Sequence, residues 1–396
     1  MSREPRGVYL DYAATTPVDP RVAARMAECL TQDGIFGNPG SVGHPYGEAA
    51  NELCEQARAQ VAAAVGALAS EVIFTSGATE ANNLAIFGIA HYYRDAGRHI
   101  VTVRTEHKAV LDPCRELERR GWQVTYLVPD RQGVLDPAQL AAALRPDTVL
   151  VSIMHVNNEI GLIQDIAALA AVCRQAGRAR LHVDAAQSVG KCTLDFTALG
   201  ADLMSVSAHK AYGPKGVGAL VVSRPRAVQL APLHHGGGQE RNLRSGTVPT
   251  HQVVGMGAAF ALAHAALDEE PGRIAALRDR LWGQLAALGG VLRNGGDGPG
   301  GNLLSVPHLL NVAFEGVEGE SLLAAVQPHI AVSSGSACTS GTGEASYVLR
   351  ALGRDERLAE SSLRFSFGRF SRESDVDAAG RVVAAAVRRL RRIGGA

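Results

Sequence analysis

The sequence predicts an α/β protein, with a large domain built on a mostly parallel sheet of seven strands and a smaller α/β domain. Short β-branched runs alternate with helical stretches from about residue 70 to residue 225. A glycine run at 236–238 then precedes a separate set of helices and strands. Because such alternation is typical of parallel strands covered by helices on both faces, we expect the first region to form the sheet.

The strands of the large domain are expected at seven apolar, β-branched runs: Glu71 to Thr75, His99 to Val103, Gln123 to Val128, Thr148 to Met154, Arg180 to Val183, Leu203 to Val206 and Ala219 to Ser223. A Gly/Pro-rich loop, Phe36 to Gly47, precedes a helix from about Glu48 to Val65, which Gly66 ends. In sheets of this kind functional groups gather at the carboxyl ends of the strands, so the loops after these runs are where we expect a site.

The smaller domain is expected to follow a long helix from about His251 to Leu267. Its elements are a helix that reaches about Leu288 and strands near Leu310 to Phe314, Ala331 to Ser333 and Leu363 to Phe367. We predict a large domain at 18–262 and a small domain that combines 1–17 with 263–396.

Composition and charge narrow the class of protein. Of the 396 residues, 46% are hydrophobic and 20% charged, which is typical of a folded globular chain. Basic and acidic residues number 39 each, so no net field favours nucleic acid or an anionic membrane as a partner. The longest apolar run, Val253 to Leu267, is too short to span a bilayer and contains His264. We therefore expect a cytoplasmic protein without a membrane span.

The cysteines are scattered through the chain, at Cys29, Cys54, Cys114, Cys173, Cys192 and Cys338. They form no Cys-x-x-Cys pair, and no histidine cluster has zinc spacing. The pattern indicates neither a disulfide framework nor a structural metal. Most of these side chains are expected to be buried as small hydrophobes.

Two candidate groups follow the first strands. Ser76 to Thr79 forms a strand-to-helix turn, in which free amides and the positive end of a helix dipole could bind a phosphate; a well-capped helix is the alternative. His107 follows the strand at 99–103, where an imidazole could stack on a flat cofactor and exchange protons. An isolated histidine at a helix start is the simpler interpretation of that residue.

Three further candidates follow later strands. Asp184 could hold a protonated pyridine nitrogen, with Gln187 three residues on, or could simply cap a helix. Lys210 could form a Schiff base with an aldehyde cofactor. Lys215 competes for that role, but it lies in the Gly/Pro turn at 212–216, whose tip is expected to be solvated, so we favour Lys210.

The C-terminal third supplies a thiol and a guanidinium. Cys338 lies in a stretch of small, polar residues, 333–343, that is typical of an exposed loop, so it is either a travelling nucleophile or an incidental surface cysteine. Arg364 alternates with apolar neighbours on a strand expected to be half-buried, and it could clamp a carboxylate or be solvated. The basic loop at 241–247 could reach a phosphate or be a linker.

Several of these motifs together resemble one family. They are Asp184 to Lys191, His209-Lys210, Arg244 to Thr247, Ser333 to Ser340 and Ser152 to Gly161. The combination resembles the cysteine desulfurases of the IscS/NifS type, in the class V aminotransferase family of fold-type I pyridoxal-phosphate enzymes. The resemblance runs over nearly the whole chain. It implies a pyridoxal-phosphate-dependent transferase fold of type I and a homodimer with pyridoxal 5'-phosphate near the subunit interface.

The resemblance also implies site residues. Lys210 would be the Schiff-base lysine, Cys338 would receive sulfur from L-cysteine as a persulfide, and alanine would be released. The remaining roles are cofactor binding by Ala78, Thr79, His107, Asn158, Asp184, Gln187, Ser207, His209 and, from the other subunit, Thr247, and substrate binding by Arg364 and Asn158. No resident metal is implied, although Cys338 is expected to be able to ligate a nascent iron-sulfur cluster transiently.

Three features differ from the family pattern. Ala208 stands where glycine is usual before His-Lys, and Ala345 replaces a proline that is common after the cysteine segment. The chain also ends at Ala396 without the longer tail by which typical relatives help to dock an iron-sulfur scaffold. The acceptor therefore stays open, as an iron-sulfur scaffold or another protein such as one serving tRNA thiolation. The alternative functions are a selenocysteine lyase, another β-eliminating enzyme, or a non-catalytic assembly subunit.

Overall fold

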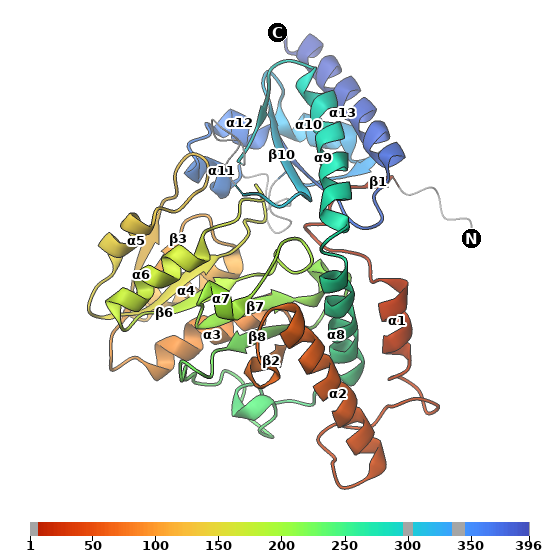
Figure 1. Ribbon diagram of the computed structural model, residues 1–396. Helices are drawn as coiled ribbons and strands as arrows, with labels where there is room; N and C mark the ends of the chain where they lie inside the picture. Colours follow the sequence, from red (N-terminus) through yellow and green to blue (C-terminus); the bar gives the residue numbers. More distant parts are fainter. Residues whose placement is uncertain (1–6, 296–303, 335–344, 396) are drawn as a thin grey trace.

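The computed structural model describes residues 7–295, 304–334 and 345–395. Its largest element is a seven-stranded sheet with the order β2-β8-β7-β6-β5-β3-β4 (Figure 1). The strands are β2 (Val72–Thr75), β3 (His99–Val103), β4 (Gln123–Leu127), β5 (Thr148–Met154), β6 (Arg180–Asp184), β7 (Leu203–Ser207) and β8 (Gly218–Val222). All neighbours are parallel except β8, which runs antiparallel to both β7 and β2. The predicted mostly parallel α/β sheet is confirmed.

Helices cover both faces of this sheet. The helices are α1 (Pro20–Ala27), α2 (Pro45–Ala64), α3 (Ala78–Tyr92), α4 (Lys108–Arg119), α5 (Pro137–Ala143), α6 (Ile166–Ala176), α7 (Phe196–Leu199) and α8 (Thr250–Ala265). One apolar core lies between the sheet and α2, α5, α6 and α8, and another between the sheet and α3 and α4. Because both faces are buried, the strands are nearly continuous apolar runs, as parallel strands usually are.

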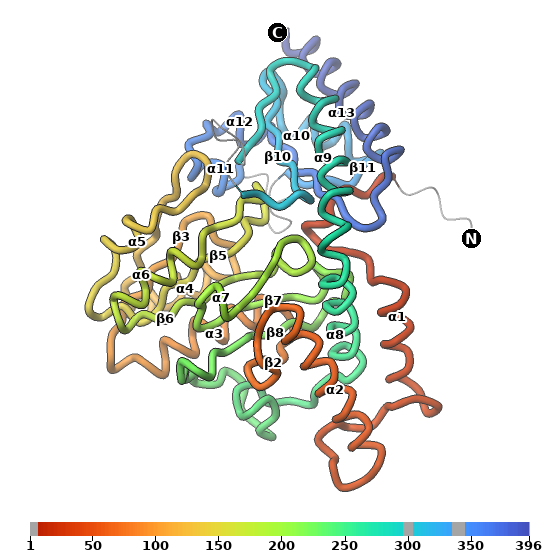
Figure 2. The backbone as a smooth tube through the Cα atoms, viewed as in Figure 1, coloured from red at the N-terminus to blue at the C-terminus, as the bar shows by residue number. Residues whose placement is uncertain are grey.

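A third core lies in the C-terminal region. It contains the antiparallel sheet β12-β10-β9 and the parallel pair β1-β11. The strands are β1 (Val8–Tyr9), β9 (Val291–Arg293), β10 (Leu309–Phe314), β11 (Ile330–Ala331) and β12 (Ser362–Ser366), and the helices are α9 (Glu270–Ala286), α10 (Gly319–Val326), α11 (Tyr347–Ala351), α12 (Glu356–Glu360) and α13 (Glu373–Ile393). Figure 2 shows the red N-terminal segment beside this blue region, and Leu10 packs in its core. The domain boundaries at 17/18 and 262/263 remain predictions.

Several local expectations need correction. Strand β12 was expected to be half-buried, but all five of its residues are buried. One face packs Leu363 and Phe365 in the third core, while segments around Asp11 and Ser333 form bridges along its free edge. A strand is expected at Ala331 to Ser333, but the structure has the two-residue β11, which ends at Ala331. Ser333 forms an isolated bridge to Arg364 of β12. The sequence analysis did not identify the 21-residue helix α13 or the short strand β9.

Four cysteines, Cys29, Cys54, Cys114 and Cys173, are buried as expected, and Cys192 is half-buried. In the part of the chain that is described, no helix is both long and apolar enough to cross a membrane. Within the same residues, no group of three or more acidic, histidine or cysteine side chains is arranged to hold a metal ion.

Candidate active site

A cavity of about 500 Å³ lies at the carboxyl ends of the central strands. The predicted site residues that line it are Ala78, Thr79, His107, Asn158, Asp184, Gln187, Ser207, His209, Lys210 and Arg364. Most of them lie at or just after the ends of strands in the seven-stranded sheet, whereas Arg364 comes from β12 of the smaller sheet. The fold therefore brings together residues that lie up to 286 positions apart, from 78 to 364. Thr247 is exposed and does not line this cavity.

The turn before α3 forms one wall. Gly77 precedes the helix with a φ of +152°, and no side chain caps the first-turn amides. Strand β8 begins directly behind this turn, because a Cβ on Gly218 would lie 2.7 Å from the backbone of Gly77. The uncapped amides and the positive end of the helix dipole make this wall suitable for an anion.

Ser207 ends β7 and His209 lies two residues further on, and both line the cavity. The Ser207 hydroxyl is buried and has no hydrogen-bond partner among the described residues. The Nδ1 atom of His209 lies 3.1 Å from the Thr15 hydroxyl. Burial lowers the pKa of His209 to about 4, so its imidazole is neutral at pH 7. Between them, Ala208 is accommodated because its methyl group packs against Gly213, which has no side chain.

Asp184 ends β6 and faces the cavity with its carboxylate held on both oxygens. Its Oδ2 accepts a hydrogen bond of 2.7 Å from Asn82 Nδ2, and its Oδ1 accepts one of 3.0 Å from the amide of Ala186. Sequence analysis missed Asn82, although its spacing of four residues from Ala78 puts both on one face of α3. These donors fix the orientation of the carboxylate, which can bind a protonated ring nitrogen.

His107 caps α4 beside this carboxylate. Its Nδ1 accepts a hydrogen bond of 3.1 Å from the amide of Ala109, which leaves Nε2 as the protonated nitrogen of a neutral ring. Burial lowers the pKa of His107, which supports that neutral form. Glu106 behind it is fully buried, accepts a hydrogen bond from the amide of Met154, and has its pKa raised well above the usual value by burial.

Lys210 and Lys215 differ in their surroundings. Lys210 Nζ donates to the carbonyl oxygens of Ala13 and Ala14 at 2.5 and 2.8 Å, so the N-terminal segment holds it at the cavity. Lys215 is exposed at the following turn, as expected, although it reaches the cavity rim. An enclosed amine is better placed than an exposed one to react with a bound aldehyde.

The backbone around Lys210, which we call the lysine loop (207–213), is fixed by the N-terminal segment. Tyr212 has a left-handed backbone, with a φ of +63°, which is uncommon for a bulky residue. Its amide donates to the Thr16 hydroxyl at 2.8 Å, and that hydroxyl donates to the carbonyl of His209 at 3.0 Å. The amide of Asp19 donates to the Tyr212 carbonyl. These bonds hold the strained residue in place.

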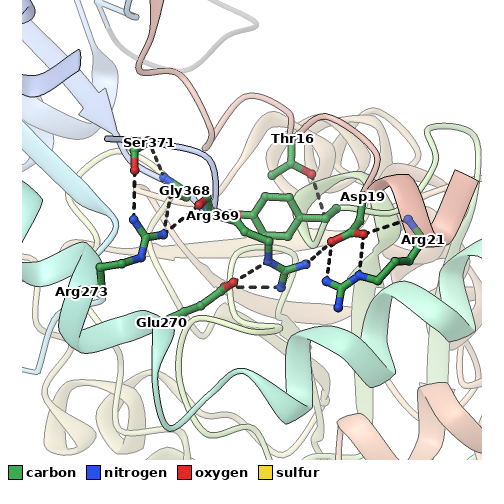
Figure 3. A network of polar contacts seen from close by, with 9 residues as sticks. Thr16, Asp19, Arg21, Glu270, Arg273, Gly368, Arg369 and Ser371 are labelled. Carbon is green, nitrogen blue, oxygen red and sulfur yellow. Dashed lines mark hydrogen bonds and ion pairs between the residues drawn. The ribbon is translucent and has the colours of Figure 1, made fainter. Parts of the chain in front are cut away.

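A group of ion pairs centred on Arg369 lies beside the same tyrosine. Figure 3 shows the pairs of Arg369 with Asp19 and Glu270. The Arg369 guanidinium lies 4.3 Å from the centre of the Tyr212 ring and forms ion pairs with Asp19, at 2.7 Å, and with Glu270. The amide of Arg369 donates to the Tyr212 hydroxyl at 2.6 Å. Arg21 forms a second, bidentate contact with Asp19. Residues from both sequence ends therefore brace the lysine loop.

Arg364 is fully buried, with 1% of its surface exposed, rather than solvated. Its Nη1 donates to the carbonyl of Asn158 at 2.9 Å, and its Nη2 forms an ion pair with Asp11 at 2.8 Å. Its Nε has no partner among the described residues. Because a guanidinium carries five N–H donors, donors remain available toward the cavity for a carboxylate.

Cys338 lies outside the described residues. The residues on either side of that segment are anchored beside the cavity. Ser333 pairs with Arg364 through two backbone hydrogen bonds, of 2.7 and 3.2 Å. On the far side, the Ser346 hydroxyl donates to Glu159 at 2.5 Å and the Tyr347 hydroxyl donates to the carbonyl of Glu106 at 2.7 Å.

The second loop near the α3 turn is the arginine loop (238–247). Three consecutive residues, Glu240, Arg241 and Asn242, have φ values of +49°, +59° and +64°. Arg58 donates to both carboxylate oxygens of Glu240, at 2.7 and 2.8 Å, and the amide of Phe74 donates to the same carboxylate at 2.7 Å. This buried pair holds the loop that leads to Thr247. The pair was not predicted from the sequence.

Comparison with known proteins identifies relatives over almost the whole chain. Residues 8–379 match the aminotransferase class-V family. A curated relative, Cysteine desulfurase IscS of Pseudomonas putida (strain W619), is 56% identical over 386 residues, which cover 98% of this chain and 94% of that protein. A solved NifS-like protein is 35% identical with a TM-score of 0.89, covering 97% of this chain and 100% of its own.

A structure titled SspA in complex with cysteine has a TM-score of 0.79 at 38% identity, covering 91% of this chain and 98% of its own. The relatives therefore match the chain in sequence and in fold, and the match includes the segments that line the cavity. The resemblance seen in the sequence is confirmed: the chain belongs to the aminotransferase class-V family, among relatives named as cysteine desulfurases.

Proposed function

We propose that this protein is a cysteine desulfurase, which converts L-cysteine to L-alanine and transfers the sulfur through a persulfide on Cys338. The observation that carries the proposal is the convergence of Lys210, Asp184 and Arg364 on one cavity in a chain that is 56% identical to an IscS. Lys210 supplies an amine, Asp184 a carboxylate that can hold a protonated ring nitrogen, and Arg364 a buried guanidinium that can bind a carboxylate. Fold alone would not fix this chemistry.

The cavity fits pyridoxal 5'-phosphate. Its lining contains four buried polar atoms without partners among the described residues: Asn82 Oδ1, Asn158 Oδ1, Ser207 Oγ and Arg364 Nε. Uncapped amides at one wall suit a phosphate, while the Asp184 carboxylate suits a protonated pyridine nitrogen. Buried polar atoms of this kind are normally satisfied, so they favour a polar ligand in the cavity.

We propose the following division of roles. The phosphate would be held by Ala78, Thr79, Ser207 and His209, and by Thr247 of a second subunit. Asp184 and Gln187 would bind the ring nitrogen and the ring hydroxyl, His107 would stack on the ring, and Asn158 would lie beside it. When bound, the coenzyme supplies an electron sink for the carbanion at the substrate Cα.

The chain's own groups would perform the remaining steps. Arg364 binds the substrate carboxylate and, with Asn158, sets the orientation of the amino acid. Lys210 removes the proton from the substrate Cα. The Cys338 thiolate attacks the substrate sulfur, so that a new S–S bond forms while the Cβ–S bond breaks. Protonation of the remaining carbon skeleton gives alanine, and the persulfide carries the sulfur to an acceptor.

We further propose that the protein acts in the cytoplasm as a homodimer and delivers sulfur to an iron-sulfur scaffold or another acceptor protein. The exposure of Thr247, which does not line its own chain's cavity, supports the dimer. In a dimer this residue would be available to the other subunit's site. A molar mass of twice 41.5 kDa in light scattering is the expected result.

The function is tested by incubating the purified protein with cysteine, and separately with selenocysteine, and measuring alanine and protein-bound persulfide. We expect alanine from cysteine, with persulfide on the tryptic peptide that contains Cys338. Cys338→Ser should abolish both, whereas Cys192→Ser should retain both, because the Cys192 thiol donates to the carbonyl of Ser188 and does not line the large cavity. Normal sulfur release by Cys338→Ser, or alanine from selenocysteine alone, would contradict the proposal.

A further inference from the structure

Gln187 forms a hydrogen bond with Lys191, a residue outside the proposed cofactor and substrate contacts. Its Oε1 accepts a hydrogen bond of 2.7 Å from Lys191 Nζ, and its Nε2 donates to the carbonyl of Ala13 at 2.8 Å. A backbone carbonyl can only accept, so the amide nitrogen must face Ala13 and the amide oxygen must face Lys191. The positions of the amide nitrogen and oxygen of Gln187 therefore follow from its hydrogen-bond partners.

This orientation leaves the second N–H of Gln187 without an acceptor in the part of the chain that is described. A primary amide carries two N–H groups, and the Ala13 carbonyl takes one of them. Gln187 lines the large cavity, so the second N–H is available there to an acceptor on a bound molecule. Donation from Lys191 to Oε1 withdraws electrons from the amide and strengthens its N–H groups as donors.

A second, small cavity lies behind Lys191. Its accessible volume is about 20 Å³, which is enough for one water molecule. Lys191, Lys210 and His308 are among its lining residues. His308 is 2% exposed, and neither of its ring nitrogens has a hydrogen-bond partner among the described residues. Two unsatisfied ring nitrogens beside a water-sized space with a lysine favour a bridging water.

We propose that Lys191 is a positioning residue for Gln187, and that one buried water joins Lys191 to His308 behind it. The inference rests on the proposed function, because the free N–H of Gln187 is expected to meet the ring hydroxyl of pyridoxal phosphate. His308 would contact the water, the water would contact Lys191, and Lys191 contacts Gln187. These contacts would set the strength of the hydrogen bond that Gln187 donates to the ring oxygen.

The charges around Lys191 agree with this arrangement. Burial lowers the pKa of Lys191 well below its usual range, and the nearby cations Lys210 and Arg364 lower it further, while the Cys192 thiolate would oppose them. Burial also lowers the pKa of His308 well below its usual range. A neutral amine and an ammonium both donate to Oε1, and the neutral imidazole keeps one nitrogen that donates and one that accepts.

The test uses the full-length protein loaded with pyridoxal phosphate, and follows its visible absorbance as a function of pH. Lys191→Met should raise the pH midpoint of the absorbance change by about half a unit or more. Without Lys191, Gln187 donates a weaker hydrogen bond to the ring oxygen and therefore stabilises its negative charge less. His308→Leu should raise it by less. Lys191→Arg, which still donates, and Cys192→Ser, a neighbour without a contact to Gln187, should keep the midpoint of the unchanged protein.

A crystal structure of the protein adds a readout independent of activity. We expect a water within hydrogen-bond distance of both Lys191 and His308, and its loss in His308→Leu. An unchanged midpoint in Lys191→Met, or a dry cavity beside His308, overturns the inference. If the unchanged protein gives no visible absorbance with pyridoxal phosphate, the proposed function itself fails, which is a distinct result.

Discussion

The lysine loop and the arginine loop both contain residues with left-handed backbones, but they are held differently. Tyr212 in the lysine loop is fixed by backbone hydrogen bonds and by ion pairs whose members Arg369 and Glu270 keep partial contact with water. Glu240 in the arginine loop is fixed by a bidentate pair with Arg58 in which both side chains are buried. The first clamp joins the lysine loop to segments near both ends of the sequence, whereas the second joins the arginine loop to α2 and to β2 of the large sheet.

The difference indicates which clamp dominates stability. Removing one partner of a buried pair leaves a charge that water cannot reach, whereas a partly exposed group can be rehydrated. The arginine loop should therefore be decisive for folding. The lysine loop, whose contacts are many and individually modest, should be decisive for the placement of Lys210.

The largest effect is expected from Glu240→Ala. It leaves the Arg58 guanidinium buried without its bidentate partner, and we expect a loss of about 3–5 kcal/mol in the free energy of unfolding. Urea denaturation measures it. Glu55→Ala is the matched control, because Glu55 pairs with the same arginine at 2.9 Å but is 53% exposed, and it should cost about 1 kcal/mol or less. Equal losses in the two variants would refute the distinction.

Arg369→Ala should have an intermediate effect of about 2 kcal/mol, because it removes the stacking on Tyr212 and two ion pairs. The loss is limited because Asp19 keeps its bidentate contact with Arg21. Arg369→Lys should recover only part of the loss, since an ammonium lacks the planar fork. Full recovery in denaturation experiments would show that charge alone matters.

Asn242 tests the backbone strain of the arginine loop. At a φ of +64°, Asn242→Ala should destabilise the protein by about 1 kcal/mol, because a Cβ without a local polar partner disfavours this region. Asn242→Gly should stay within about 0.5 kcal/mol of the unchanged protein. If alanine and glycine give the same midpoint in urea, conformation is not what selects asparagine here.

The last prediction concerns how the stability of the lysine loop clamp changes in acid. Hydrogen bonds from Arg21, and then from Arg369, hold the pKa of Asp19 well below its usual range. A depressed folded pKa gives stability that is present above the unfolded value of about 4 and is lost as pH falls toward the folded value. Asp19→Asn should remove this slope between pH 4 and lower values. An unchanged slope in thermal unfolding curves would exclude Asp19 as its source.

Much of the large sheet could be predicted because its strands are buried on both faces. The bounds of β3 and β5 match the predicted runs His99 to Val103 and Thr148 to Met154, which are continuous apolar or β-branched segments. The three-residue β9 gave too short a pattern to identify. The β12 pattern misled, because Arg364 is polar yet buried against Asp11 and Asn158, contacts that depend on tertiary structure.

The site also contains residues that the sequence identifies and contacts that only the fold reveals. Lys210, Asp184 and His107 could be found because each follows a strand, and parallel strands end at one edge. Arg58 and Glu240 are 182 positions apart, and Asn82 and Asp184 are 102 apart. No local sequence pattern predicts a contact over such a separation. Lys191 was within reach of sequence reasoning, since it lies four residues after Gln187, but its buried surroundings become visible only in the fold.

The central claim is that the enclosed Lys210, and not the exposed Lys215, joins the chain to its aldehyde coenzyme. Borohydride reduction of the protein loaded with pyridoxal phosphate, followed by digestion and fragmentation mass spectrometry, distinguishes the two lysines. We predict a reduced pyridoxal-phosphate adduct on Lys210 alone. An adduct on Lys215, or an unmodified Lys210, would contradict the account.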